Sequence, residues 1–294
     1  MKPRQKSISS QKLKPSRRLS QNFLVDRLVA ARIADALDIV RGDLVFEIGA
    51  GKGFLTEYLV TRGARVVAVD KDHRMIGMLK KKYPAGSGVE VVYADVLDMP
   101  EDLLPKQKTI LVGNLPYGIS HPLVFWICDR AVRWKHAVIM LQREVARRLC
   151  AGPGDRGRSA VSIQVQLRCR PTYLFEVAPV AFYPRPKVTS AVVRLDFPSA
   201  FGHIEPDDSF RYIVEAAFAH KRKIVANNLR ALAGVTAPEV DMVLQEASIE
   251  RTQRAEQLSI EEFAHLAAAA RRVWGDRLLS SGNVADFKRR RPEQ

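Results

Sequence analysis

The chain has 294 residues, enough for one large domain or two ordinary ones, and its apolar fraction of 47% excludes wholesale disorder. Its 47 basic and 32 acidic side chains give a formal net charge of +15, which indicates a polyanionic partner more than a device for solubility. A membrane surface is the weaker candidate for that partner, because no apolar run is long enough to span a bilayer.

Residues 1–18 carry seven lysines or arginines and no acid, so we expect a disordered basic tail that serves either solubility or phosphate contact. The three cysteines, Cys128, Cys150 and Cys169, are far apart and form no CxxC pair. This usage is typical of free thiols in a reducing cytoplasm. The six histidines are scattered, and we predict no metal site.

From residue 43 the chain alternates strands and helices. Apolar runs predict buried strands at 43–48, 64–70, 89–95, 109–113 and 136–141, separated by helical segments such as 54–60, 73–83 and 122–131. Such alternation favours a parallel, doubly wound sheet. Segments 162–167 and 187–197 alternate or are rich in β-branched residues, and they predict further strands, some of them antiparallel.

Residues 197–208 contain two prolines, a glycine and an acid pair, which indicates a linker. Beyond it the chain is predicted to be helical. Phe210, Ile213, Val214, Ala217 and Phe218 recur at helical spacing and form one apolar face. Ser259 with Glu262 forms a capping box. The predicted fold class is therefore α/β, with a Rossmann-like and mostly parallel sheet followed by a small all-helical domain. The expected divisions are a basic tail at 1–18, the α/β domain at 19–200, the helical domain at 201–275 and a second basic tail at 276–294.

A glycine-rich turn follows the first predicted strand. Glycines at 49, 51 and 53 permit a tight turn and close approach of a ligand to the backbone. The dinucleotide fingerprint requires glycine where this chain has Phe54, so a pyrophosphate site is disfavoured. Glu47, just before the turn, also favours a ligand with a positive or neutral centre.

Two carboxylates end the next predicted strands. Asp70 is placed to accept hydrogen bonds from ribose hydroxyls, and Asp95 from an adenine amine. Each aspartate alone is equally consistent with a helix or turn cap. An acidic crevice for a nucleoside in a strongly basic protein suggests S-adenosylmethionine used on a nucleic acid.

The stretch Asn114-Leu115-Pro116-Tyr117 follows the fourth predicted strand beside the same crevice. A carboxamide oxygen and the Leu115 carbonyl can accept both N–H bonds of an aromatic amine and so free its lone pair for attack. Tyr117 offers a ring on which a flipped base can stack. A strand-exit turn with a core tyrosine is the plainer interpretation of the same residues.

Several collinear motifs resemble the KsgA/RsmA family of rRNA adenine dimethyltransferases. They include LSQNFLVD at 19–26, FEIGAGKGFLT at 46–56, GNLPYGIS at 113–120, FYPRPKVTSAVVRL at 182–195 and KRKIVANNL at 221–229, and the match covers roughly 17–270. The resemblance implies a class I methyltransferase that dimethylates two adjacent adenosines in the 3′-terminal hairpin loop of small-subunit rRNA. A pre-ribosomal particle would be its substrate, and a cytoplasmic monomer its form.

The resemblance also assigns roles to residues. Catalytic roles fall to Asn114, Leu115 and Tyr117. Phe182 would be a second aromatic at the base, with Tyr117 stacking on it. The implied cofactor contacts are Asn22, Leu24, Gly49, Asp70, Asp95 and Asn114. Asp70 stands where many members have glutamate, and both side chains can accept from ribose.

The basic excess predicts phosphate contacts on several elements, for which solvated charged faces are the alternative. The candidates are Arg143, Arg147, Arg148, Arg158, Lys221, Arg222 and Lys223. Two alternative functions remain open. One is an Erm-type large-subunit rRNA methyltransferase that confers antibiotic resistance, and the other is a non-catalytic RNA-binding assembly factor.

Overall fold

A computed structural model describes residues 21–204, 206–232 and 234–278. The predicted tail at 1–18 lies outside this part of the chain, as does most of the tail predicted at 276–294. The strands are β1 Phe23–Leu24, β2 Leu44–Ile48, β3 Arg65–Asp70, β4 Val89–Tyr93, β5 Thr109–Asn114, β6 Trp134–Gln142, β7 Arg170–Val177, β8 Phe182–Tyr183 and β9 Ser190–Asp196. The helices are α1 Arg27–Asp35, α2 Phe54–Thr61, α3 His73–Lys82, α4 Ser120–Asp129, α5 Arg143–Cys150, α6 Ala160–Gln166, α7 Asp208–Ala217, α8 Val225–Leu229, α9 Ala237–Glu246 and α10 Ile260–Trp274.

Seven strands form the main sheet in the order β4-β3-β2-β5-β6-β9-β7. The five from β4 to β6 are parallel, while β9 runs antiparallel to both β6 and β7. The chain reverses its direction of winding between β2 and β5, where a crevice opens at the carboxyl ends of the strands. The predicted fold class is confirmed.

Both faces of the sheet are buried, as the unbroken apolar runs of the strands require. Successive residues of a strand point to opposite faces, so Val45 packs with α1 and α2 while Phe46 packs with α4. Each face has its own hydrophobic cluster. The sheet is thus a rigid platform whose strand ends hold the loops in place.

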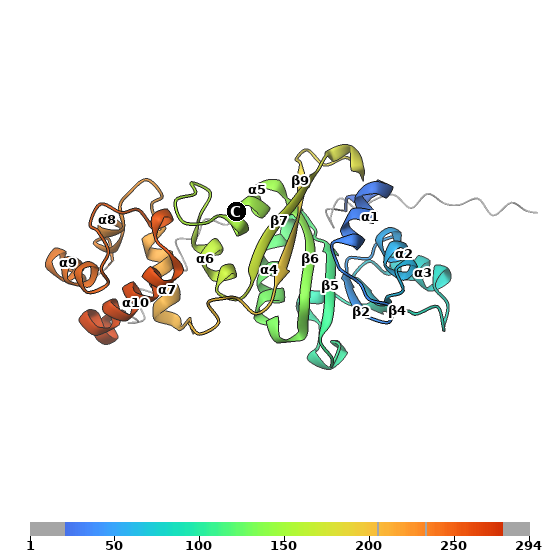
Figure 1. Cartoon of the computed structure of the whole chain (residues 1–294), viewed down its shortest axis with the longest axis horizontal. Helices are drawn as coiled ribbons and strands as arrows, with labels where there is room; N and C mark the ends of the chain where they lie inside the picture. Colours follow the sequence, from blue (N-terminus) through green and yellow to red (C-terminus); the bar gives the residue numbers. More distant parts are fainter. Residues whose placement is uncertain (1–20, 205, 233, 279–294) are drawn as a thin grey trace, which may run out of the picture.

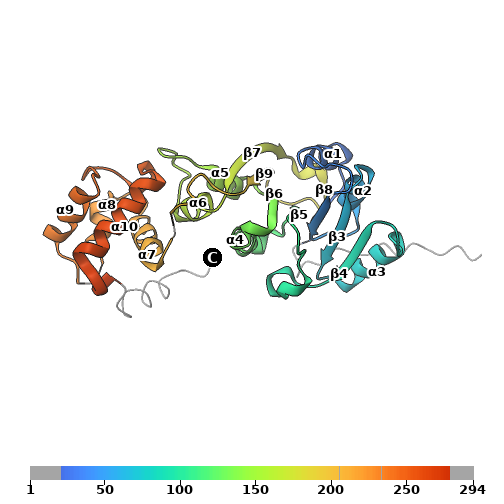
Figure 2. The same ribbon diagram turned by 60° about the horizontal axis from the view of Figure 1, so that its bottom comes forward.

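The helices α7–α10 gather at one end of the molecule, with α5 and α6 between them and the sheet (Figures 1 and 2). Phe210, Ile213, Val214 and Ala217 are buried, as the predicted apolar face of α7 requires, while Phe218 follows the helix and is partly buried. Ser259 accepts a hydrogen bond from the backbone N–H of Glu262, whose carboxylate accepts one from Ser259, so the predicted capping box is confirmed. The predicted domain division itself stays a prediction.

The prediction of a strand at 162–167 is wrong, because residues 162–166 belong to α6 and Leu167 is its C-cap. The alternating apolar residues pack into two different hydrophobic clusters and not onto one face of a sheet. Ile163 and Leu167, four residues apart, pack into the helical cluster, while Val165 packs into a cluster of the sheet. A helix wedged between two cores buries apolar residues on both sides, which imitates the period of a strand.

Strand β7 has no counterpart among the predicted elements. It carries Pro171 near its start, and proline cannot donate a hydrogen bond to a neighbouring strand. The structure places β7 at the edge of the sheet, where a missing backbone N–H costs little.

Among the described residues, no helix is long and apolar enough to cross a membrane.

Candidate cofactor and base site

A pocket lies at the carboxyl ends of β2, β3 and β5, where the sheet order reverses. It is lined by seven of the residues singled out from the sequence, namely Asn22, Gly49, Asp70, Asp95, Asn114, Leu115 and Tyr117. A neighbouring hollow shares Gly49 and Asn114 with this pocket and is also lined by Leu24 and Glu47. The structure therefore joins segments that are distant in sequence into one site.

The glycine turn needs glycine for its backbone conformation. Gly49, Gly51 and Gly53 have φ values of 71°, 56° and 71°, in the left-handed region that other residues rarely adopt. A Cβ atom on Gly51 would lie 3.2 Å from the ring of Phe23, and one on Gly53 would lie 2.8 Å from Leu79. The turn is consequently close-packed against its surroundings while its backbone faces the pocket.

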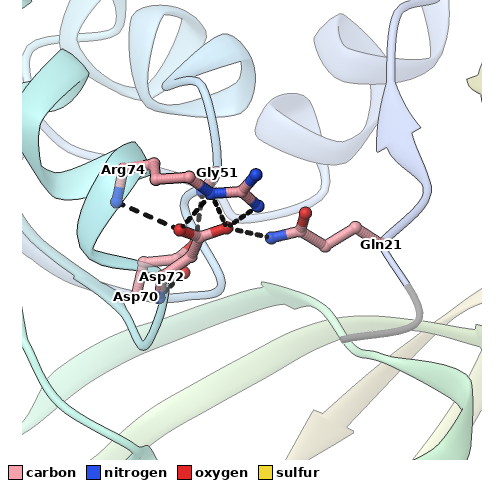
Figure 3. A network of polar contacts seen from close by, with 5 residues as sticks. All are labelled: Gln21, Gly51, Asp70, Asp72 and Arg74. Carbon is pink, nitrogen blue, oxygen red and sulfur yellow. Dashed lines mark hydrogen bonds and ion pairs between the residues drawn. The ribbon is translucent and has the colours of Figure 1, made fainter. Parts of the chain in front are cut away.

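Asp70 ties the glycine turn to the end of β3. Its two carboxylate oxygens accept hydrogen bonds from the backbone N–H groups of Gly51 and Asp72, each at 2.8 Å (Figure 3). The side chain is 8% exposed, and this burial raises its pKa. Each oxygen retains a second lone pair, so acceptance from a ribose hydroxyl is compatible with these bonds.

Asp95 performs the capping role that the sequence left open. One carboxylate oxygen accepts from the backbone N–H of Leu97 at 3.2 Å, and the other lies 3.1 Å from the Lys71 ammonium. Both side chains are about one-third exposed and line the pocket. Asp95 therefore presents a carboxylate at the pocket edge whose charge Lys71 partly balances. Lys71 was not predicted as a site residue.

The orientation of Asn114 is determined by a distant backbone carbonyl. Its amide nitrogen donates to the carbonyl of Asn22 at 3.0 Å. A carbonyl can only accept, so the amide nitrogen must face it, and the carboxamide oxygen of this pocket-lining side chain points away from that bond. The next residue, Leu115, donates its backbone N–H to Met140 at 3.1 Å, which anchors the turn to β6.

Tyr117 is held by its hydroxyl as well as by packing. The hydroxyl lies 2.6 Å from Ser190 Oγ at the start of β9. The ring is part-buried and lines the pocket, and burial raises the pKa of the hydroxyl. The hydrogen bond of its hydroxyl and the packing of its ring therefore hold the Tyr117 side chain in the wall of the pocket.

The segment before α1 lines the same pocket with Gln21, Asn22 and Phe23. Gln21 donates to Asp72 at 2.9 Å, and Arg74 pairs with the same carboxylate at 2.5 Å (Figure 3). The Arg74 guanidinium holds the pKa of Asp72 below its usual range. Gln21 belongs to the motif LSQNFLVD, so the sequence pointed to it. No sequence signal distinguished Asp72 from an ordinary helix cap.

Strands β1 and β8 pair antiparallel, with Leu24 opposite Phe182 and Phe23 opposite Tyr183. Phe182 is 2% exposed and belongs to a core cluster that also contains Leu24. Its neighbour Tyr183 is 61% exposed and lines the hollow beside the pocket. The structure thus brings Phe182 near the site but inside the core, and its role at the base stays a prediction.

Glu47 is almost fully buried beneath the glycine turn. Its carboxyl accepts a hydrogen bond from the Thr56 hydroxyl at 2.6 Å, and desolvation raises its pKa to about 8. At neutral pH the carboxyl therefore holds its proton most of the time. Glu47 therefore stabilises a cationic ligand less than an ionised carboxylate at the surface would.

The seven predicted phosphate contacts do not form one set. Arg143, Arg147, Arg148, Arg158 and Lys221 line a single groove between α5 and the helical end. Arg222 and Lys223 are exposed but do not line it.

Among residues 21–204, 206–232 and 234–278, no cluster of three or more acidic, histidine or cysteine side chains could hold a metal ion.

Comparison with known proteins identifies the relatives of this chain. The family model of ribosomal RNA adenine dimethylase matches residues 12–270. Ribosomal RNA small subunit methyltransferase A of Geobacter metallireducens is 39% identical over 265 residues, covering 87% of this chain and 96% of its own. The protein of the same name from Alkaliphilus metalliredigens is 36% identical over 266 residues, covering 88% and 93%.

Two solved structures agree with this result. A dimethyladenosine transferase from Plasmodium falciparum has a TM-score of 0.72 at 28% identity, covering 85% of this chain and 98% of its own. The 23S rRNA methyltransferase ErmE has a TM-score of 0.64 at 27% identity, covering 84% and 99%. On the family model and these relatives, the chain belongs to the ribosomal RNA adenine dimethylase family.

Proposed function

We propose that this protein transfers methyl groups to the N6 amines of two adjacent adenosines in the 3′-terminal hairpin loop of small-subunit rRNA. S-adenosylmethionine-dependent dimethylation of rRNA adenine is the activity of the family. The observation that carries the proposal is the Asn114 carboxamide, whose oxygen is presented by the bond from its nitrogen to Asn22. Beside it stands the Tyr117 ring in the same pocket.

The pocket suits the nucleoside part of S-adenosylmethionine. Asp70 supplies acceptors at the ribose position and Asp95 an acceptor at the pocket edge, while Val96, Ile119 and Leu123 provide apolar walls for a flat ring. When bound, the cofactor supplies a methyl group that is made electrophilic by the sulfonium. The close-packed glycine turn allows the backbone to approach it.

Asn114 and Leu115 would act on the acceptor amine. An adenine amine is a weak nucleophile because its lone pair is delocalised into the ring. Two carbonyl oxygens that accept both N–H bonds favour a tetrahedral nitrogen, and so stabilise the charge that develops as the methyl group transfers. Tyr117 would hold the flipped base by stacking, which contributes roughly 1–3 kcal/mol.

The choice of ribosomal subunit follows from the relatives. The curated proteins at 35–39% identity are named for the small subunit. The Plasmodium dimethyladenosine transferase also has a higher TM-score than ErmE. A small-subunit substrate is therefore favoured over the large-subunit alternative. The oriented Asn114 carboxamide disfavours a non-catalytic assembly factor, for which such an arrangement has no use.

A pre-ribosomal particle is the substrate we propose, with the enzyme acting as a monomer in the cytoplasm. The formal charge of +15 supports a large phosphate-rich partner. A folded particle offers phosphates to several elements at once, whereas a free nucleotide would engage the pocket alone.

The test is methyl transfer from radiolabelled cofactor to undermethylated small subunits, compared with large subunits, followed by mass spectrometry of the modified base. We expect N6,N6-dimethyladenosine in small-subunit RNA only. Asn114→Ala should slow single-turnover transfer by about 10²–10³-fold with RNA affinity nearly unchanged, because it removes an acceptor of the developing charge. A wild-type rate for this variant, or product in large-subunit RNA, would contradict the proposal.

A further inference from the structure

A short segment, residues 21–24, forms part of the wall of the cofactor pocket, and we call it the rim segment. Its residues Gln21, Asn22 and Phe23 line the pocket. The second half of the segment is fixed by strand pairing, since Phe23 and Leu24 form β1 and pair with β8. The first half lies outside the strand and is held by hydrogen bonds that involve side chains.

Two such hydrogen bonds connect the first half of the rim segment to distant elements. The backbone carbonyl of Asn22 accepts from the Asn114 amide at 3.0 Å, which ties the segment to the end of β5. The side-chain amide of Gln21 donates to Asp72 at 2.9 Å, which ties it to the start of α3 (Figure 3). The first bond belongs to the base site, whereas the second joins the segment to a carboxylate that does not line the pocket.

Asp72 is a strong acceptor for the Gln21 amide. The residue is only 4% exposed, yet its carboxylate stays ionised because the Arg74 guanidinium holds its pKa below the usual range. The backbone N–H and the guanidinium of Arg74 both donate to this carboxylate. Hydrogen bonds to an ionised acceptor are stronger than those between neutral groups. Asp72 therefore holds the Gln21 amide more firmly than a neutral side chain would.

The same residue reaches the proposed ribose acceptor through its backbone. The N–H of Asp72 donates to Asp70 at 2.8 Å, and the other carboxylate oxygen of Asp70 accepts from Gly51 in the glycine turn. The glycine turn, the ribose acceptor and the rim segment are thus linked through Asp72 (Figure 3). A residue in this place can set the geometry of ligand contacts without touching the ligand.

The rim segment bears on how cofactor enters and product leaves. Dimethylation of one adenine consumes two molecules of S-adenosylmethionine, so S-adenosylhomocysteine must be exchanged for fresh cofactor at least once for each base. A wall of the pocket has to move for this exchange. Side-chain bonds at Gln21 can open and re-form without breaking the pairing of β1 with β8, so the first half of the segment is the part that can move at the lowest cost.

We propose that Asp72 is a positioning residue that holds the rim segment against the cofactor through Gln21, and that opening of this bond sets the rate of cofactor exchange. The cofactor binds tightly only when the segment is attached. Its apparent dissociation constant is then the intrinsic one divided by the attached fraction, so a variant that is attached about one tenth of the time binds about tenfold more weakly. The inference goes beyond the proposed function and holds whichever adenine is methylated.

The variant Gln21→Glu tests the proposal, because it places a second carboxylate beside Asp72 on a side chain of the same size. Repulsion should detach the rim segment. We expect the dissociation constant for S-adenosylmethionine to rise about tenfold, mainly through faster dissociation. The added negative charge alone would favour the cationic cofactor, so a loss of affinity reports the position of the segment and not the charge.

The matched control exchanges donor and acceptor in the pair. In the double variant Gln21→Glu with Asp72→Asn, the new carboxylate can accept from the asparagine amide, and the asparagine oxygen can still cap α3. We expect this double variant to recover most of the lost affinity. Asp72→Asn alone should have a smaller effect than Gln21→Glu, because the Gln21 amide can turn over and accept from the asparagine.

The release of radiolabelled S-adenosylhomocysteine measures the exchange rate directly, with and without undermethylated small subunits. This product carries no methyl group to transfer, so no turnover interferes. We expect release from Gln21→Glu to be about tenfold faster in both conditions. In transfer assays the KM for the cofactor should rise by a similar factor, while kcat at saturating cofactor stays near wild type. The melting temperature of the cofactor-free variant should also stay near wild type.

Three outcomes would overturn the proposal: wild-type affinity and release in Gln21→Glu, a double variant that binds no more tightly than Gln21→Glu, or a loss of melting temperature in the cofactor-free variant that the double variant does not recover. The proposed function fails in a different way. If Gln21→Glu releases S-adenosylhomocysteine faster than wild type but wild type transfers no methyl group to small subunits, the assigned substrate is wrong and the role of Asp72 stands.

Discussion

The direction of the Asn114 carboxamide comes from Asn22, which is 92 residues away in sequence. The same dependence on a distant partner recurs at Tyr117, whose hydroxyl meets Ser190, whereas the carboxyl of Glu47 meets Thr56 of the neighbouring helix α2. Each side chain is of a type suited to its task. Its placement depends on another segment folding against it.

Tyr117→Phe tests what the hydroxyl contributes. The ring needed for stacking is retained, so turnover should fall only a few-fold, while loss of the bond to Ser190 should cost about 1 kcal/mol in the free energy of unfolding. Ser190→Ala should give a similar loss, and the double variant little more than either single one. Tyr117→Ala should nearly abolish transfer. Additive losses in the double variant would show that the two hydroxyls do not interact.

The raised pKa of Glu47 leads to a prediction about how stability depends on pH. Its pKa is raised in the folded protein from the ordinary value of 4.5 to about 8, so between these values the folded state binds more protons than the unfolded state. Stability that depends on Glu47 is therefore lost as pH rises through this window, by at most about 1.4 kcal/mol per pH unit. Glu47→Gln removes this loss.

Denaturant unfolding of the cofactor-free protein at pH 5 and pH 8 measures the effect. We expect the stability of Glu47→Gln relative to wild type to increase from the lower to the higher pH. The glutamine oxygen can still accept from Thr56, so the hydrogen bond is preserved in the control. An unchanged difference between the two proteins would mean that Glu47 is ionised in the folded state.

At the scale of elements, the pairing of β1 with β8 is what unites the site. It brings the segment that holds Asn114 next to the motif that contains Phe182. Backbone bonding continues beyond the pair, since Val25 donates to Ala181 at 2.9 Å. Loss of either short strand should therefore disturb the cofactor pocket and the base pocket together.

Phe182 and Tyr183 offer a matched pair on β8 for locating the second aromatic contact. Phe182→Leu keeps a buried apolar side chain and should cost less than about 1.5 kcal/mol of stability. If the Phe182 ring contacts the base, its turnover should nevertheless fall at least tenfold. Tyr183→Leu is the control and should leave turnover near wild type. The reverse pattern in single-turnover transfer would assign the contact to the exposed Tyr183.

At the scale of the whole molecule, basic side chains lie on two parts of an elongated particle, in the middle on α5 and at the helical end after α7 (Figure 1). Arginines of α5 belong to the part beside the sheet, while Lys221, Arg222 and Lys223 follow α7 in the helical part and are exposed. A single RNA partner can contact both parts at once. Its binding should therefore depend on salt more steeply than either part would alone.

Reversal of Lys221, Arg222 and Lys223 to Glu tests this distribution of charge. We expect weaker binding to the small subunit and a salt slope reduced by about 0.7–0.9 for each phosphate that the variant no longer binds. Cofactor affinity, measured by calorimetry, should not change because the pocket lies at the sheet. A triple variant that binds like wild type would show that these charges serve solubility.

The sequence by itself determined which segments form the parallel strands. It also determined the glycine turn and the carboxylates at the strand ends. These are local consequences of apolar runs and of backbone conformations that only glycine adopts easily. The motifs also brought Asn22, Asp70, Asp95 and Asn114 into one predicted site, and the structure places them in one pocket.

Only the tertiary structure decided the conformation of 162–167 and the environment of Arg158. A period of two predicts a strand, but burial against two cores turned these residues into α6. A basic residue in a Gly-rich loop predicts an exposed side chain, yet Arg158 is buried, and its loop is bonded through Gly154 to Glu256 ahead of α10. Both outcomes depend on contacts between segments far apart in the chain, and neither periodicity nor composition records which segments will meet.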